Sequence, residues 1–108
     1  MKFPGGGGMG QMMAQAQKMQ AQMKAKQEEL SLQEMDFESA GGRIKLRVNG
    51  KQEVLSLEID KEIIDPGDSE MLCDLVMVAV NEAMTGSQEM VNKEMSKLIP
   101  PGMAGLLG

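Results

Sequence analysis

The residues best suited to do chemistry in this chain are cations in a segment without acids. Residues 9–27 carry three lysines and neither aspartate nor glutamate. Ammonium groups without acidic neighbours attract phosphate oxygens, and glutamine side chains add hydrogen-bond donors for the same oxygens. The sequence therefore predicts that any anion contact lies in this segment. The candidate contacts are Lys18, Lys24, Lys26, Gln15 and Gln22.

The residue types that carry most catalysis and metal binding are scarce. The chain has no histidine, and Cys73 is its one cysteine. A Ser–His or Cys–His catalytic pair and a Cys/His metal site are therefore excluded. A single cysteine cannot form an intramolecular disulfide, which is typical of a reducing cytosol. We expect no enzymatic activity, no catalytic residues, no cofactor, no metal and no small-molecule substrate.

Length and charge bound the class of protein further. The 108 residues fit one compact domain, and the formal net charge is -5. Residues 61–108 hold eight acids against three bases, so the acidity gathers towards the C-terminus. The apolar run LVMVAV at 75–80 is too short to span a bilayer, and MKFPGGGG lacks the apolar core of a secretory signal. We expect a cytoplasmic protein without membrane contact.

A second group of cations lies in GGRIKLRVNG, residues 41–50. Arg43, Lys45 and Arg47 alternate with apolar residues and share one face of a predicted strand. The stripe either contacts nucleic acid or pairs with acids on a neighbouring strand. Those acids would be Glu34, Asp36 and Glu38.

Three strands are predicted around this segment, joined as an antiparallel meander. A four-residue loop at 39–42 would place Phe37 opposite Ile44 and Asp36 opposite Lys45. The dipeptide Asn49-Gly50 suggests a two-residue turn, but that register would put apolar residues opposite charged ones. A longer loop at 49–52, or a bulged equivalent, instead pairs apolar with apolar residues, Leu46 with Leu55 and Ile44 with Leu57.

Two helices flank the strands. Residues 11–33 consist of good helix formers with a narrow apolar stripe. Either this is an amphipathic helix that pairs with another helix, or its Lys/Gln face lies along a phosphate backbone. After the turn PGDS at 66–69, a broad apolar stripe predicts the helix that covers the sheet, weakened at Gly86 and resuming over 89–97. The candidate packing and dimer residues are Met12, Ala16, Met19, Met23, Leu30, Leu72, Leu75, Val76 and Ala79.

The expected fold is α+β, with the order helix, three-stranded antiparallel meander, helix. Residues 1–10 would be a flexible Gly-rich N-terminus, 11–98 the domain, and 99–108 a flexible Pro/Gly tail. Three strands and one covering helix make a small core, and the first helix cannot bury its stripe within one chain. Both features predict a homodimer with projecting first helices.

The order and spacing of several segments resemble the YbaB/EbfC family of nucleoid-associated, DNA-binding proteins. The matching pieces are GGGGMG, QMMAQAQKMQAQMKAKQEEL, SAGGRIKLRVNG, LEID, SEMLCDLVMVAVNEA and PPGM, over nearly the whole chain. The resemblance implies homodimers whose sheets and second helices form a body and whose first helices project as arms. It also implies DNA binding with low sequence specificity, a cytoplasmic, nucleoid location, and a role in chromosome organisation, recombination or repair.

Two functional hypotheses follow from the sequence. In the first, the lysines of the first helix bind duplex DNA through its phosphates. In the second, the Met/Ala stripe docks a recombination or replication protein, and the acidic second helix keeps DNA affinity low.

Overall fold

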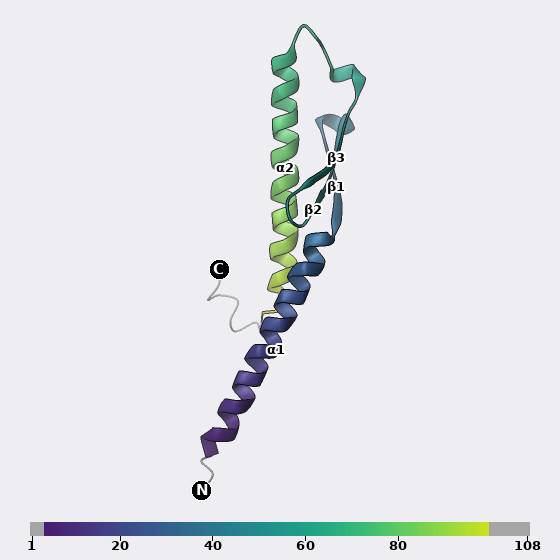
Figure 1. Ribbon diagram of the computed structural model, residues 1–108. Coiled ribbons are helices and arrows are strands. Elements are labelled where there is room, and N and C mark those ends of the chain that lie inside the picture. Colours follow the sequence, from purple (N-terminus) through teal and green to yellow (C-terminus); the bar gives the residue numbers. More distant parts are fainter. Residues whose placement is uncertain (1–3, 100–108) are drawn as a thin grey trace.

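The computed structural model describes residues 4–99, with the side chains of residues 9–99 (Figure 1). The elements follow the order α1 (Pro4–Leu32), β1 (Glu34–Ser39), β2 (Ile44–Asn49), β3 (Val54–Ile59) and α2 (Ser69–Ser96). Short 3-10 turns, η1 (Ala40–Gly42) and η2 (Lys61–Ile63), follow β1 and β3. The strands form one antiparallel sheet in the order β1-β2-β3, which confirms the predicted α+β class.

Helix α1 begins earlier than the sequence predicts. We expected residues 1–10 to precede the helix, but α1 starts at Pro4 and runs through the glycines. Proline is tolerated in the first turn of a helix, and a strong helix propagates into weak neighbours once nucleated. Residues 1–3, and residues 100–108 of the expected tail, lie outside the described residues.

The register between β1 and β2 differs from the predicted one by two residues. Phe37 lies opposite Leu46 and Asp36 opposite Arg47, where we expected Ile44 and Lys45. The reversal occurs later because residues 40–42 all take left-handed φ angles between 54° and 86°. Since side chains repeat every two residues, a two-residue shift keeps each side chain on its predicted face.

The second hairpin also pairs two residues away from the expected partners. Leu46 lies opposite Leu57 and Ile44 opposite Ile59, with a bulge at Arg47/Val48. A bulged, longer loop was one of the predicted forms, and Asn49 builds it. Its side-chain oxygen accepts hydrogen bonds from the backbone N–H groups of Lys51 at 3.0 Å and Glu53 at 3.1 Å.

The core lies between β2 and α2. The inward residues of β2 are fully buried against Ala79 and Ala83 of α2, and Ile63 closes one end. The small alanines let the helix approach the central strand. Partly buried side chains surround this cluster: Phe37 from β1, and Leu72, Leu75, Val76 and Val80 from the apolar stripe predicted for α2.

Helix α2 is continuous through Gly86, contrary to the predicted interruption. A Cβ atom at Gly86 would lie 2.3 Å from a carbon of the Phe37 ring. The glycine therefore lets the aromatic ring pack against the helix. The next residue, Ser87, is buried and donates a hydrogen bond to the carbonyl oxygen of Asn49 at 2.8 Å.

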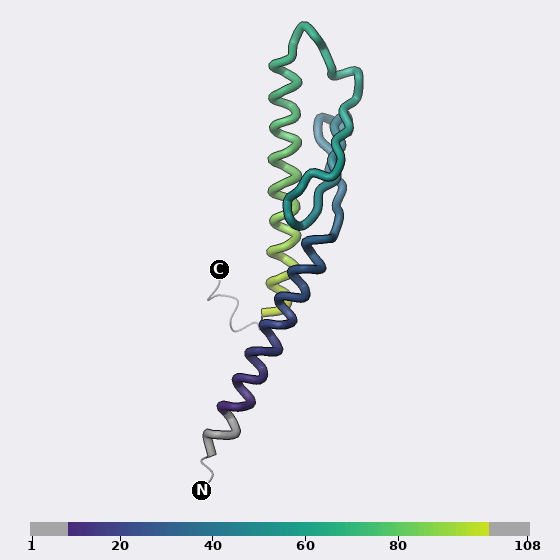
Figure 2. The backbone as a smooth tube through the Cα atoms, in the orientation of Figure 1, coloured from purple at the N-terminus to yellow at the C-terminus, as the bar shows by residue number. Residues whose placement is uncertain are grey.

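The molecule is elongated, with extents of 84 × 24 × 17 Å. Figures 1 and 2 show α2 beside the sheet and α1 leaving this body at one end. The end of α1 contacts the C-terminal part of α2 and β2, whereas its N-terminal half projects away from the sheet. We call residues 9–27 of α1 the arm, and the sheet with α2 the body.

Candidate nucleic-acid interface

One face of the arm brings together three of the five candidate phosphate contacts. Gln15, Lys18 and Gln22 follow each other at helical spacings of three and four residues, so they share a face. All three are exposed. They line a hollow of about 510 Å³ with three residues of the apolar stripe and one from beyond α2, namely Met12, Ala16, Met19 and Leu98.

Lys24 is exposed on a different side of the arm. At ~100° of rotation per residue, it lies about 120° around the helix from Lys18. The face between the two lysines carries exposed small side chains, including Ala14 and Ala21. An extended anion can therefore approach the helix closely there while the two ammonium groups flank it.

Lys26 has a different environment from the other two lysines. Its side chain is only 28 % exposed, and its Nζ lies 3.7 Å from a carboxylate oxygen of Glu29. The Lys97 ammonium donates a 2.9 Å hydrogen bond to Glu94 of α2, which lowers the pKa of Glu94, and the charge of Lys26 contributes to that lowering. Lys26 thus belongs to the junction between arm and body.

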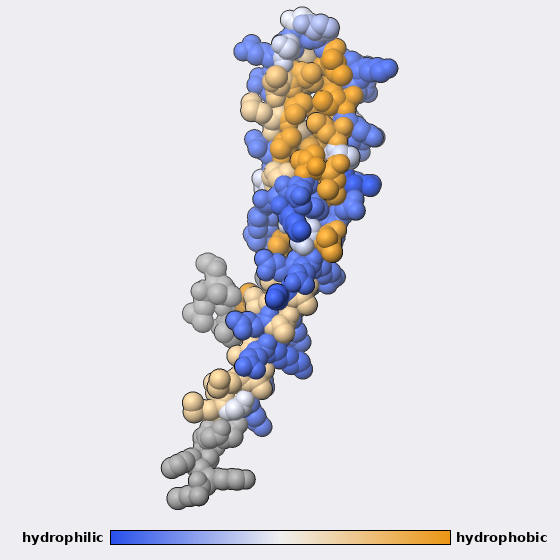
Figure 3. Space-filling view, in the orientation of Figure 1, coloured by the Kyte–Doolittle hydropathy of each residue, from blue (hydrophilic) through white to orange (hydrophobic). Residues whose placement is uncertain are grey.

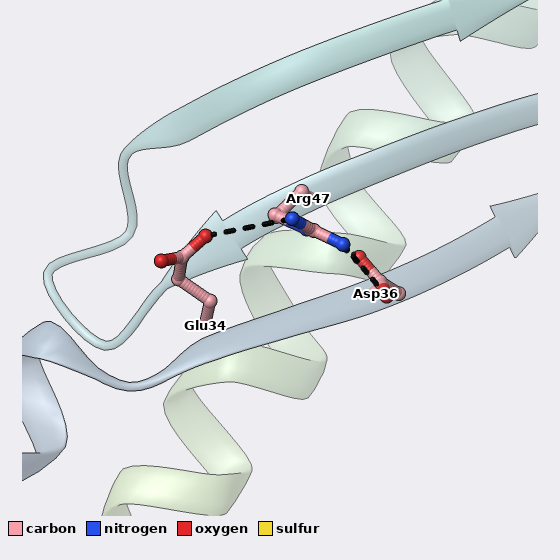
Figure 4. Close-up of polar contacts among 3 residues, drawn as sticks. All are labelled: Glu34, Asp36 and Arg47. Carbon is pink, nitrogen blue, oxygen red and sulfur yellow. Dashed lines mark hydrogen bonds and ion pairs between the residues drawn. The ribbon is translucent and has the colours of Figure 1, made fainter.

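The cationic stripe on β2 is matched by acids. Arg47 donates from Nε to Asp36 at 2.9 Å and lies 3.8 Å from Glu34 (Figure 4). This hydrogen bond lowers the pKa of the Asp36 carboxyl and raises the pKa of Arg47. Lys45 lies opposite Glu38 on one side and Glu58 on the other. The acids of β1 therefore match two of the three cations of the stripe.

Arg43 pairs outside the acids predicted for it. Its guanidinium lies 3.8 Å from Glu62 in η2. The two-residue register shift moves Arg43 into the loop before β2, so it has no partner position on β1. Of the two interpretations of this stripe, nucleic-acid contact or pairing with acids, the structure shows acidic partners for Arg43 and Arg47.

The apolar candidates separate into an exposed and a buried set. Met12 and Ala16 of the arm are exposed, Met19 and Met23 are half-buried, and Leu30 is fully buried. In α2, Leu72, Leu75 and Val76 are half-buried and Ala79 is buried. The stripe of α1 is therefore covered only towards its C-terminal end.

The body carries a further exposed apolar surface that the sequence did not predict. Helix α2 packs on β1 and β2, so the helix-facing side of β3 is open. Leu57, which shares the face of buried Leu46, is 44 % exposed, and Leu55 is 48 % exposed. On α2, Met71 and Val78 are exposed as well. Figure 3 shows apolar side chains gathered on the body where α2 and β3 adjoin.

The alternation of apolar and polar residues along β3 predicted an inward-facing side for this strand. It did not predict that α2 does not cover that side. We call Leu55, Leu57, Met71, Leu75 and Val78 the apolar body face.

Within residues 4–99, no group of three or more potential ligands could hold a metal ion. Among the helices of this range, none combines the length and apolarity needed to cross a membrane. The polar groups that the arm presents are lysine and glutamine donors, which suit phosphate and sugar oxygens.

Comparison with known proteins agrees with this chemistry. Residues 5–103 match the model of the YbaB/EbfC DNA-binding family. A nucleoid-associated protein of Alkaliphilus metalliredigens is 52 % identical over 89 % of this chain and 87 % of its own length. One from Ruminiclostridium cellulolyticum is 44 % identical over 98 % of this chain and 94 % of its own length.

A solved structure supports the fold alone. The crystal structure of the uncharacterized protein HP0035 from Helicobacter pylori aligns with a TM-score of 0.63 at 20 % identity. The alignment covers 78 % of this chain and 98 % of the other.

Proposed function

Since this chain belongs to the YbaB/EbfC DNA-binding family, we propose that it coats duplex DNA as a homodimer, through the phosphate backbone and with low sequence specificity. The observation that carries the proposal is the projecting arm, whose Lys18 and Lys24 are exposed in a segment that contains no acid (Figure 1). Its place would be the nucleoid, in chromosome organisation or in recombination and repair.

The mechanism is electrostatic. Each lysine that neutralises a phosphate releases condensed counterions, and this release drives association. Gln15 and Gln22, which share the face of Lys18, donate hydrogen bonds to backbone oxygens and hold the arm in place. Donors of this kind read the backbone and not the base edges, so affinity should vary little with sequence.

The dimer of this proposal joins two copies through the apolar body face. Leu55 and Leu57 lie on the open side of β3, and a partner would bury them at a gain of ~25 cal/mol per Å² of apolar surface. The core of one chain is small, so this burial also supports the fold. Two arms per particle double the number of phosphate contacts.

The experiment that tests DNA binding is fluorescence anisotropy with two labelled duplexes of unrelated sequence at low salt. We expect similar affinities for both duplexes and loss of binding in the double variant Lys18→Glu/Lys24→Glu. The matched control Lys45→Glu/Lys61→Glu makes the same charge change away from the arm and from the turn at 49–53, and should retain most of the affinity. Equal losses in both variants would refute the placement on the arm.

The dimer has its own test in sedimentation velocity. Leu57→Glu should yield a monomer, because the charge would be buried in the interface. Ser56→Glu alters the neighbouring residue on the opposite face of β3 and should leave the dimer intact. A dimeric Leu57→Glu variant would refute the proposed interface.

A second candidate function rests on the hollow beside the arm. Met12, Ala16 and Met19 line it with Leu98, and such a methionine-rich surface suits the docking of a partner helix. In that case a recombination or replication protein would be recovered with this chain after nuclease treatment. Purified protein without DNA affinity at low salt would favour this candidate over the first.

A further inference from the structure

The C-terminal end of α1, just beyond the arm, contacts the turn between β2 and β3. Leu30 in this end of α1 is 1 % exposed but lies outside the main core cluster. Next to it, a Cβ atom built on Gly50 would lie 1.9 Å from the carbonyl oxygen of Leu30 and 2.6 Å from its carbonyl carbon. Two backbone segments therefore touch at a point where only glycine fits.

Gly50 is not required by the conformation of the turn itself. The positive φ angle in this loop belongs to Gln52, whereas Gly50 is not among the residues with positive φ. An alanine would be tolerated at Gly50 if the arm were elsewhere. The requirement for glycine thus comes from the closeness of α1.

The same turn is hydrogen-bonded to α2. Its first residue, Asn49, accepts the hydrogen bond from buried Ser87 through its carbonyl oxygen. Farther along the turn, the side chain of Gln52 donates to the side chain of Gln88. One short loop thus contacts the end of the arm on one side and α2 on the other.

We propose that the turn at residues 49–53 is the joint that sets the direction of the arm, with Gly50 as the positioning residue. This inference rests on the proposed function for its consequence, because the direction of each arm decides which phosphates Lys18 and Lys24 reach. Residue 9 lies about 32 Å from Leu30 at ~1.5 Å per residue, so a tilt of about 10° moves it by roughly 5 Å. A small displacement at the joint is therefore amplified at the arm.

The direct test measures arm geometry in Gly50→Ala. The exposed native Cys73 and a cysteine introduced as Gln20→Cys carry spin labels, and an excess of unlabelled protein restricts the measured distances to pairs within one chain. We expect the distance distribution of Gly50→Ala to shift or broaden. Gly10→Ala is the matched control, because a Cβ atom there meets nothing within 4 Å and the distribution should not change.

The second readout is affinity for a labelled duplex, which we expect to fall about tenfold in Gly50→Ala through loss of preorganisation. A distance distribution identical to that of wild type would overturn the joint, whatever the affinity. An altered distribution with unchanged affinity would support the joint and overturn DNA binding by the arms.

A variant that spares the turn keeps the inference testable if Gly50→Ala does not fold. Leu30→Ala removes the buried anchor of the arm, and Leu30 is not part of the core cluster between β2 and α2. The body of Leu30→Ala should therefore stay folded by circular dichroism while the distance between arm and body broadens. An unchanged distribution in Leu30→Ala would likewise overturn the joint.

Discussion

The three lysines of the arm should contribute unequally to the salt dependence of DNA binding. Each phosphate neutralised on duplex DNA contributes ~-0.9 to the slope of log K against log salt. If Lys18 and Lys24 are engaged in both copies, the slope is about -3.6, and affinity falls roughly 150-fold between 50 and 200 mM salt. Engagement of Lys26 as well would steepen the slope to about -5.4.

The structure separates these cases because Lys26 is half-buried beside Glu29 and close enough to act on Glu94. Lys18→Gln and Lys24→Gln should each reduce the slope by about 1.8 in a dimer, since each removes two contacts. Lys26→Gln should leave the slope nearly unchanged. A lysine already paired with a carboxylate, as Lys26 is with Glu29, releases few counterions when it meets a phosphate.

The assay is anisotropy of a labelled duplex titrated at several salt concentrations, with Lys45→Gln as a control on the sheet. If Lys26→Gln flattens the slope as much as Lys18→Gln, Lys26 contacts phosphate as fully as Lys18 and the expected difference between the lysines is refuted. If Lys45→Gln has the effect of the arm variants, DNA contacts the sheet as well, although Lys45 lies between two acids in the sheet register.

Three predictions concern the fold. Gly86→Ala should lower the free energy of unfolding by ~1–3 kcal/mol in urea, because its methyl group would collide with the Phe37 ring and this outweighs the helix propensity gained; a stabilised variant would contradict the packing. Ser87→Ala should cost ~1–2 kcal/mol in the same assay by leaving a buried carbonyl oxygen without its donor, and an unchanged midpoint would count against that hydrogen bond. The lowered pKa of Asp36 means that its ionised form stabilises the fold above its ordinary pKa, and that this contribution is lost as pH falls through the lowered value. Melting temperatures measured from about pH 5 to pH 2 should therefore fall more steeply for wild type than for Asp36→Asn, and parallel curves would show that the Arg47 pair adds nothing.

The sequence predicted the order of elements and the face of each strand, but not the register. Apolar residues of β1 and β2 meet apolar partners in both the predicted and the observed register, because the two differ by one full side-chain period. The choice between them depends on backbone angles in the loop at 40–42, which the alternation pattern does not encode. Charge matching could not decide either, since Asp36 finds a cation in both cases.

Long-range packing accounts for the other differences. Gly86 appears in the sequence as a weak point of a helix, and the Phe37 ring that needs it lies far away along the chain. In the same way, Asn49-Gly50 is typical of a tight turn, yet glycine is required at position 50 because the backbone of Leu30 lies too close for a side chain. A local pattern can mark a glycine as unusual, but it does not indicate which distant segment packs against it.

The sequence predicted the candidate residues of the interface that only needed to be exposed on a helix. A segment without acids and with good helix formers predicted that Lys18 and Lys24 are exposed on a helix, as the structure has them. The sequence indicates only part of the environment of Lys26. Glu29 follows three residues later and is a local neighbour, but Glu94 comes from the other end of the chain. Tertiary contact, and not local pattern, makes Lys26 different.

The length of the arm reconciles cationic contacts with an acidic protein. Lys18 lies about 18 Å from Leu30 along the helix, and Lys26 about 6 Å, at ~1.5 Å per residue. Charges are screened over ~8 Å at physiological ionic strength, so an acid weakens the local positive potential only where it lies close, as Glu29 and Glu94 do for Lys26. A shorter helix would bring a phosphate backbone within range of the eight acids of residues 61–108. Projection of the arm thus lets a chain of net charge -5 present a locally positive surface, which is where the proposed function places DNA.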